Sequence, residues 1–168
     1  MAKDLISPPD LAKWFINRTE RDAGDVITHL KLQKLVYYAQ AWHLANYGRP
    51  LFNEDMEAWT HGPVVPSLWT AYRDMGWDPI PPEPDFEIAN PKLVPLLESV
   101  YESYGAFSAK RLEDITHAED PWKVTRGNLR LEARCTRPIS KALMRDFYGR
   151  RISKSWDDAA GNKKRPGN

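Results

Sequence analysis

The longest helical pattern in the chain constrains the fold most, because it is apolar on two faces. It begins at Thr28, a good N-cap residue, and runs to Tyr47, after which Gly48 suits the left-handed position that ends a helix. One apolar stripe consists of Leu32, Leu35, Val36, Ala39 and Trp42, and the second of Leu30, Tyr37, Ala41 and Leu44. A helix that is apolar on two faces is covered on both sides. We therefore expect residues 28–47 to form the central helix of the fold.

The polar side chains of this helix follow from the same argument. Two apolar stripes leave them little surface that faces solvent, so some of them must find partners inside the protein or line an interface. They are Lys31, Gln33, Lys34, Gln40 and His43.

The rest of the chain shows five shorter helical patterns and one hairpin pattern. The helical patterns cover residues 8–16, 66–76, 90–104, 108–116 and 138–150. Residues 51–52 and 57–60 are predicted to pair as a small hairpin across residues 53–55. Prolines and acidic residues make residues 78–91 an extended linker.

These patterns predict a mainly α fold: a single compact domain of about six helices with a small β-hairpin. We expect the domain to span residues 1–152. Residues 153–168 are rich in Asp, Gly, Asn and Lys, and this composition predicts a flexible C-terminal tail. A chain of 168 residues can bury a core of its own without disulfides or metals.

The composition also excludes several classes of protein. The single cysteine, Cys135, excludes a disulfide framework, and no apolar run reaches the ~20 residues of a membrane span. The N-terminus lacks the apolar segment of a secretory signal. The sequence therefore predicts a soluble cytoplasmic protein with no membrane contact.

The net charge of +1 conceals an uneven distribution. Residues 1–120 hold 19 acidic and 11 basic residues, a net charge of −8, whereas residues 121–168 hold 4 acidic and 13 basic residues, a net charge of +9. Such asymmetry is typical of an interaction surface or tail. The alternative is that the basic end folds back on the acidic body, and the sequence leaves both interpretations open.

No motif in the chain predicts catalysis. His29, His43, His61 and His117 lack the spacing of metal ligands, and no glycine-rich phosphate loop or serine-nucleophile motif is present. Cys135 is interpreted as a small, partly buried residue. We therefore expect a protein that is not an enzyme and that has no metal or cofactor.

Tryptophan is the remaining clue. Seven tryptophans are more than a domain of this size is expected to bury, and tryptophan is enriched at the centres of protein interfaces. The sequence therefore predicts a surface that binds a partner protein. A basic series in the C-terminal quarter, Arg134, Arg137, Lys141 and Arg145, is the only feature that suggests a nucleic-acid-binding regulator, and this hypothesis ranks last.

Two blocks of sequence carry a resemblance to a known family. The first comprises KLQKLVYYAQAWH at residues 31–43, GRPLF at 48–52, EAW at 57–59 and GPVV at 62–65. The second is the pattern Leu112-x-x-Ile115-Thr116-His117-x-Glu119-x-Pro121-Trp122. Together they resemble the Panacea domain family, also described as SocA-like antitoxins or phage-associated GepA-like proteins. The resemblance extends over about residues 6–150.

The resemblance implies an antitoxin that neutralises a cognate toxin, encoded nearby, by direct protein–protein binding. The alternative that it also implies is a proteolytic adaptor that delivers the toxin to a ClpXP-type protease. Direct contact with nucleic acid is not expected, because the chain has no DNA-binding or zinc-containing module fused to the domain.

The signature residues divide into two predicted groups. Polar or aromatic residues beside the central helix are the candidates for contact with a partner: Lys31, Lys34, Arg49, Trp59 and His61. The others are predicted to hold the shape of the domain: Leu32, Gln33, Leu35, Tyr38, Trp42, Gly62, Pro63, Thr116, His117, Glu119, Pro121 and Trp122. Pro121 and Trp122 are expected to form a rigid turn that fixes the indole against the body.

Overall fold

Helix α2 (His29–Tyr47) lies at the centre of the fold, as the two-faced pattern predicts. The computed structural model describes residues 2–164, and the side chains as far as residue 152. Fourteen of the nineteen residues of α2 are buried, so the helix is covered along most of its length. The Thr28 hydroxyl accepts a hydrogen bond from the Lys31 amide, and Gly48 ends the helix with a left-handed φ of 66°. Both predicted boundaries are confirmed.

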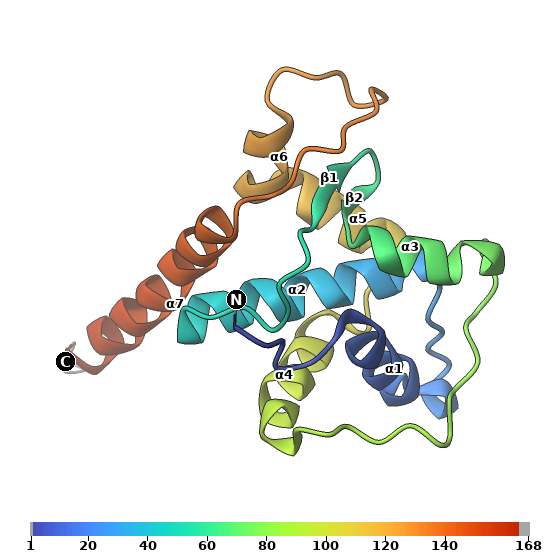
Figure 1. The fold of residues 1–168 in the computed structure, drawn as a ribbon. Helices are drawn as coiled ribbons and strands as arrows, with labels where there is room; N and C mark the ends of the chain where they lie inside the picture. Colours follow the sequence, from blue (N-terminus) through green and yellow to red (C-terminus); the bar gives the residue numbers. More distant parts are fainter. Residues whose placement is uncertain (1, 165–168) are drawn as a thin grey trace.

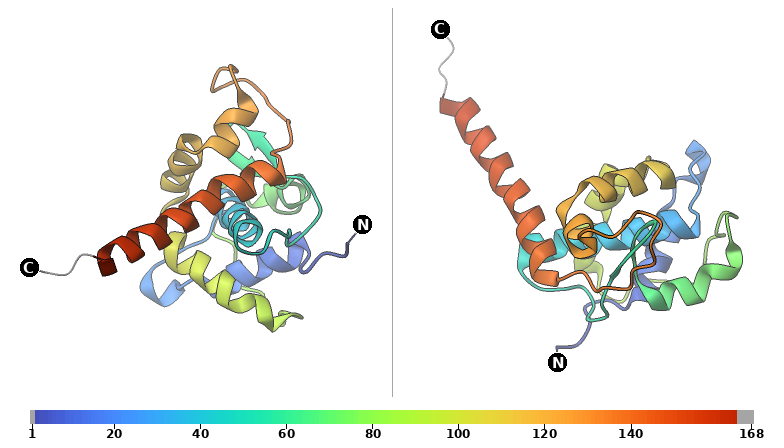
Figure 2. Two further views of the ribbon diagram at one scale, coloured as in Figure 1. Left: turned by 90° about the vertical axis from the view of Figure 1, so that its left-hand side faces the viewer. Right: turned by 90° about the horizontal axis from the view of Figure 1, so that it is seen from above.

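The other helices surround α2 (Figure 1; Figure 2, left, where α2 is seen nearly end-on). Helices α1 (Pro8–Arg18) and α4 (Val94–Tyr104) pack on one side, and α5 (Ala109–Ala118) and α6 (Asp120–Arg126) lie on the other. Helix α7 (Lys141–Lys164) crosses α2 and extends beyond the body. Helix α3 (Pro66–Tyr72) and three 3₁₀ turns, Arg21–Ala23, Arg73–Met75 and Pro91–Leu93, complete the helical elements that the structure describes. The predicted mainly α fold with a small hairpin is confirmed.

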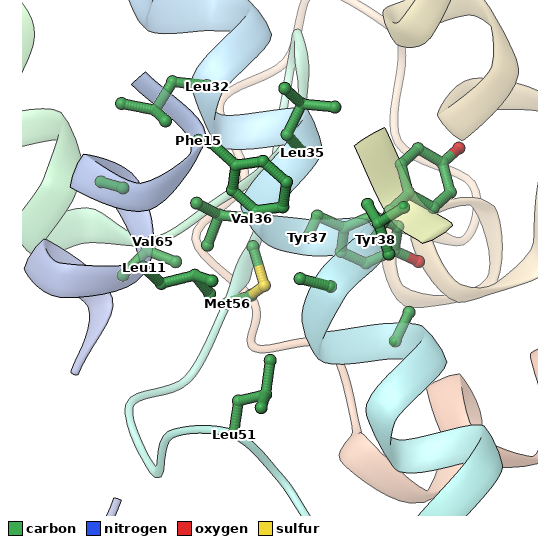
Figure 3. Close-up of a cluster of buried hydrophobic side chains, with 14 of the residues drawn as sticks. Leu11, Phe15, Leu32, Leu35, Val36, Tyr37, Tyr38, Leu51, Met56 and Val65 are labelled. Carbon is green, nitrogen blue, oxygen red and sulfur yellow. The ribbon is translucent and has the colours of Figure 1, made fainter. Parts of the chain in front are cut away.

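The core forms where α1 meets α2. Leu11 and Phe15 of α1 are fully buried beside Leu32 and Val36 of α2, and Met56 closes the cluster from below (Figure 3). The four helical residues are the inward positions of two helical patterns, so the 3.6-residue period alone assigns them to the core.

One strand of the hairpin forms where predicted, within residues 57–60, but its partner does not. Strand β1 (Glu57–Trp59) pairs antiparallel with β2 (Gly62–Val64) across the two-residue turn Thr60-His61. Leu51 and Phe52 do not join it: the Gln40 side chain accepts a hydrogen bond from the Leu51 amide at 2.7 Å and donates one to the Phe52 carbonyl at 2.9 Å. A buried amide of α2 therefore fixes the segment that was predicted to be a strand.

Pro63 is accommodated in β2 because of its position in the register. Its partner Ala58 directs both backbone groups away from β2: the amide donates to the Arg137 carbonyl, and the carbonyl accepts from Arg126. Ala58 and Pro63 thus form a non-hydrogen-bonded pair of the antiparallel ladder. At such a pair the strand needs no N–H from residue 63, so proline loses no hydrogen bond there.

Two further differences lie in the C-terminal third. Residues 120–126, where a turn was predicted at Pro121-Trp122, form helix α6, with Pro121 in its first turn. Helix α7 begins at Lys141 rather than Pro138, because Pro138 bridges to Glu57 and the Ile139 amide bonds the Met56 carbonyl at 2.7 Å. Its backbone continues to Lys164, past the predicted boundary at residue 152. The flexibility of residues 153–168 stays a prediction, and residues 165–168 lie outside the described part.

Among the described residues, no helix combines the length and apolar character that a membrane span needs.

The extended linker is confirmed between residues 79 and 90, which contain no helix or strand. Asn17 of α1 holds it by accepting from the Glu83 amide at 2.7 Å and donating to the Glu83 carbonyl at 2.8 Å.

We predict that Gly62→Ala destabilises the protein by about 2–4 kcal/mol. Gly62 has a φ of 111°, and a Cβ there would stand 2.4 Å from Cε of the buried Lys34. Gly149→Ala is the control, because a Cβ at this helical position meets nothing within 4 Å, and the helix propensity of alanine should stabilise the protein by up to about 1 kcal/mol. Urea denaturation of both variants measures the difference, and equal stabilities would contradict the prediction.

Candidate protein-binding groove

A groove of about 710 Å³ lies beside the hairpin. Its walls come from the first turn of α2, the hairpin, α3 with the turn that follows it, and residues 132–136. Its lining is mainly aromatic and apolar and includes Trp59, Val64, Trp69 and Trp77, with Arg73, Glu132 and Arg134 among its charged residues.

Three tryptophans give the groove its character. Trp59 and Trp69 meet edge to face, with ring centroids 5.6 Å apart, and the Arg73 guanidinium lies 5.4 Å from the centroid of Trp69. Trp69 is 38% exposed and Trp77 is 80% exposed. An indole left this open to water loses the benefit of burial, and such aromatic surface marks interaction sites. Among the side chains that the structure describes, the two exposed tryptophans, Trp69 and Trp77, therefore both lie in this groove.

Signature residues of α2 and α6 hold the hairpin that forms one wall. The Gln33 side chain accepts from the Val65 amide at 2.9 Å and donates to the Val65 carbonyl at 3.3 Å. On the opposite side, the Trp122 indole donates to the Trp59 carbonyl at 2.7 Å. Trp59 is thus placed by residues far from it in the sequence.

Lys34 supports the hairpin from below. Its side chain is fully buried, and Nζ lies 3.4 Å from the Pro63 carbonyl that it bonds. Burial lowers the pKa of Lys34 to about 7, although the nearby Glu113 carboxylate favours the charged form. Gly62 above this stem has a φ of 111°, which residues with a side chain rarely adopt. Lys34 is therefore part of the interior.

His61 and His117 lie on either side of the Glu113 carboxylate. His61 Nδ1 is 3.0 Å from Glu113 Oε1, and its side chain is 67% exposed at the tip of the hairpin. His117 stacks on Trp122 with ring centroids 3.9 Å apart, and burial lowers its pKa. The Thr116 hydroxyl bonds the Glu113 carbonyl at 2.8 Å, within α5. His61 is the member of this cluster that a partner can reach.

Arg126 organises the remaining wall, and sequence reasoning missed it. The side chain is 2% exposed and donates to the carbonyls of Ala58, Arg130, Leu131 and Ala133. Its guanidinium also lies 5.0 Å from the Trp122 centroid. No local pattern distinguishes it from the other basic residues around it, because its partners belong to a loop and a strand.

A second set of signature residues lies away from the groove and ties α7 to α2. The buried Glu119 carboxylate accepts from the Tyr38 hydroxyl at 2.6 Å and from the Tyr148 hydroxyl at 3.0 Å, and it pairs with Arg151 at 2.6 Å. The Trp42 indole donates to the Tyr104 hydroxyl at 2.9 Å. Leu32, Leu35 and Pro121 are also buried.

The five predicted contact residues therefore lie in three different places: in the groove, on the surface at the other end of α2, and in the interior. Trp59 and His61 line the groove. Arg49 is exposed at the opposite end of α2. The expectation for Lys31 and Lys34 is corrected: both are buried, and the Lys31 ammonium bonds the Gly105 carbonyl at 2.5 Å.

The described part of the basic quarter folds back on the body. Lys141 pairs with Asp55 at 3.0 Å and Arg151 pairs with Glu119, whereas Arg137 donates to the carbonyls of Thr125 and Arg126 within the basic quarter itself. No group of three or more His, Cys, Asp or Glu side chains within the described residues is arranged to hold a metal ion.

Comparison with known proteins gives two matches. The family described as "Antitoxin SocA-like, Panacea domain" matches residues 32–123, which include most of α2, the hairpin and Trp122. Antitoxin SocA of Caulobacter vibrioides is 44% identical over 50 residues, which are 30% of this chain and 27% of that protein. The chain thus spans about a quarter of the length of this relative. No solved structure matches the chain.

We predict that Lys34→Met removes part of the pH dependence of stability. With a pKa of about 7 in the folded protein against 10.5 in the unfolded chain, the unfolded chain binds more protons between these values, so wild-type stability should rise with pH. The slope from this group is at most about 1.4 kcal/mol per pH unit. Urea denaturation between pH 7.5 and 9 measures it. Lys110→Met, at an exposed lysine, should keep the wild-type slope, and an unchanged slope in Lys34→Met would contradict the prediction.

Proposed function

Because the chain belongs to the SocA-like antitoxin family with a Panacea domain, we propose that it is an antitoxin that neutralises a cognate toxin by binding it directly. The binding surface in this proposal is the groove of Trp59, Trp69 and Trp77. The toxin is a protein encoded nearby, as the resemblance implies.

One observation carries the proposal: residues within the family match hold the aromatic wall of an open groove. Gln33 fastens the end of the hairpin, Lys34 supports it from below, and Trp122 fixes Trp59 by its carbonyl. All of them lie in the matched range 32–123. The family's signature therefore builds a rigid support, and the neighbouring segments complete the groove on it.

The groove suits tight binding on physical grounds. Burying apolar surface yields roughly 25 cal/mol per Å², and a tryptophan presents about 200 Å². Trp59, packed against Trp69, is already held in place, so binding orders few side chains there. A partner that covers Trp69 and Trp77 gains most of its affinity from these two residues.

We predict that Trp77→Ala weakens toxin binding about 30-fold or more, which corresponds to about 2 kcal/mol at an aromatic interface anchor. Because Trp77 is 80% exposed, the variant should unfold at the wild-type temperature. The measurement is co-expression with the product of the adjacent gene, scored as relief of growth inhibition, together with the dissociation constant of the purified pair.

Tyr47→Ala is the matched control. Tyr47 is 67% exposed and lies at the other end of α2, about 27 Å from the groove by helix length. It should preserve both binding and growth. Equal loss in the two variants, or relief by Trp77→Ala equal to wild type, would overturn the assignment of the groove. Toxin abundance in the same cells separates direct neutralisation, in which the toxin persists, from delivery to a protease, in which it disappears.

A further inference from the structure

The charges around the groove differ from those of the rest of the body. Residues 1–120 have a net charge of −8, yet the charged side chains that line the groove are Arg73 and Arg134 against Glu132. His29 and His61 add two imidazoles to the same lining. The groove is therefore an aromatic and weakly basic site on an acidic body.

The two arginines are available to a ligand. Both are exposed, and in the described part of the chain neither forms a hydrogen bond or an ion pair through its side chain. Arg126 and Arg137, by contrast, donate to backbone carbonyls, those of Ala58 and Thr125 among them. The Arg73 guanidinium lies over the Trp69 ring, which orders it while its N–H groups remain free for a carboxylate.

The hairpin does not offer an edge to a partner strand. One edge is occupied by residues 137–139, through Ala58, Glu57 and Met56. On the other, the Pro63 carbonyl is bonded by Lys34, and both backbone groups of Val65 are bonded by Gln33. An occupant is therefore held by its side chains rather than by β-pairing.

We propose that the groove receives an acidic segment of the partner protein that carries a bulky apolar side chain. The apolar side chain packs among the three tryptophans, and the flanking carboxylates meet Arg73 and Arg134. This inference rests on the proposed function for the identity of the partner as a toxin, but the chemistry of the segment follows from the groove. A single-stranded nucleic acid would use the same rings and arginines, so an oligonucleotide is one arm of the test.

Selection of peptides by the full chain tests the proposal without the toxin. The probe is a random twelve-residue peptide library displayed on phage, panned against the immobilised protein. We expect the enriched sequences to combine Asp or Glu with Trp, Phe or Leu. A synthetic copy of the most enriched peptide should bind in fluorescence anisotropy and lose affinity as salt is raised.

Charge reversal then assigns the contacts. The double variant Arg73→Glu, Arg134→Glu should weaken binding of that peptide at least tenfold and should recover affinity for a copy in which lysines replace its acidic residues. Arg111→Glu is the matched control, because Arg111 is also exposed and lies over an aromatic ring, that of Phe107, outside the groove. It should bind the original peptide as wild type does.

The outcomes are distinct. Three outcomes overturn the proposal. In the first, the enriched peptides are basic or uncharged, and in the second, their enrichment is the same on the Trp77→Ala variant. In the third, the charge reversal at Arg111 weakens peptide binding as much as the double reversal at Arg73 and Arg134. Stronger binding of a twelve-nucleotide single-stranded oligonucleotide that depends on the same arginines also overturns it in favour of a nucleic-acid ligand. If acidic peptides bind but co-expression gives no relief from the toxin, the proposed function fails while the groove chemistry stands. If co-expression relieves the toxin but the selected peptides show no acidic preference, the proposed function stands and the groove chemistry fails.

Discussion

The burial of α2 along most of its length is the constraint on which the rest of the structure depends. A buried polar side chain without a partner costs about 1–3 kcal/mol, so each polar residue of this helix has to end on a hydrogen-bonding group. Four of them bond the backbone of other segments: Lys31 bonds Gly105, Gln33 bonds Val65, Lys34 bonds Pro63 and Gln40 bonds Phe52. The central helix thereby fixes the loops as well as the core.

Lys34 shows what this arrangement requires. An ammonium group in the interior is expensive, and here it has a single long hydrogen bond to a carbonyl and a favourable field from Glu113. Its stem fills the space beneath Gly62, so the hairpin can approach α2 only because residue 62 has no Cβ. Lys34 and Gly62 therefore pack directly against each other, although they lie 28 residues apart in the sequence.

The sequence could predict those elements whose signals are local. Thr28 and Gly48 mark the ends of α2, and the apolar period of α1 assigns Leu11 and Phe15 to the core. The strands could not be assigned this way, because Gly62-Pro63 is a typical chain-breaking pair and is admitted to β2 only by the outward bonds of Ala58. The start of α7 likewise depends on pairing between residues 138–139 and the hairpin.

The candidate site follows the same division. Composition predicts a partner surface, and Trp59 and His61 can be singled out from the first signature block, but local sequence does not bring Trp69 and Trp77 into the same groove with them. The burial of Lys31 and Lys34 could have been inferred from the two apolar faces of their own helix, whereas the role of Arg126 depends on four carbonyls from other segments.

The opposite charges of the two parts of the chain acquire a structural meaning from these contacts. Lys141 and Arg151 join α7 to acidic residues of the body. Arg126 donates to carbonyls of the loop between α6 and α7, and Arg137 of that loop donates to carbonyls of α6. These interactions use cations to fasten the C-terminal quarter in place. Arg134 is carried by that fastened segment to the rim of the groove, where it faces the tryptophans supplied by the acidic part. Residues 1–120 and residues 121–168 thus both line the groove, and its basic character depends on the attachment of the second part to the first.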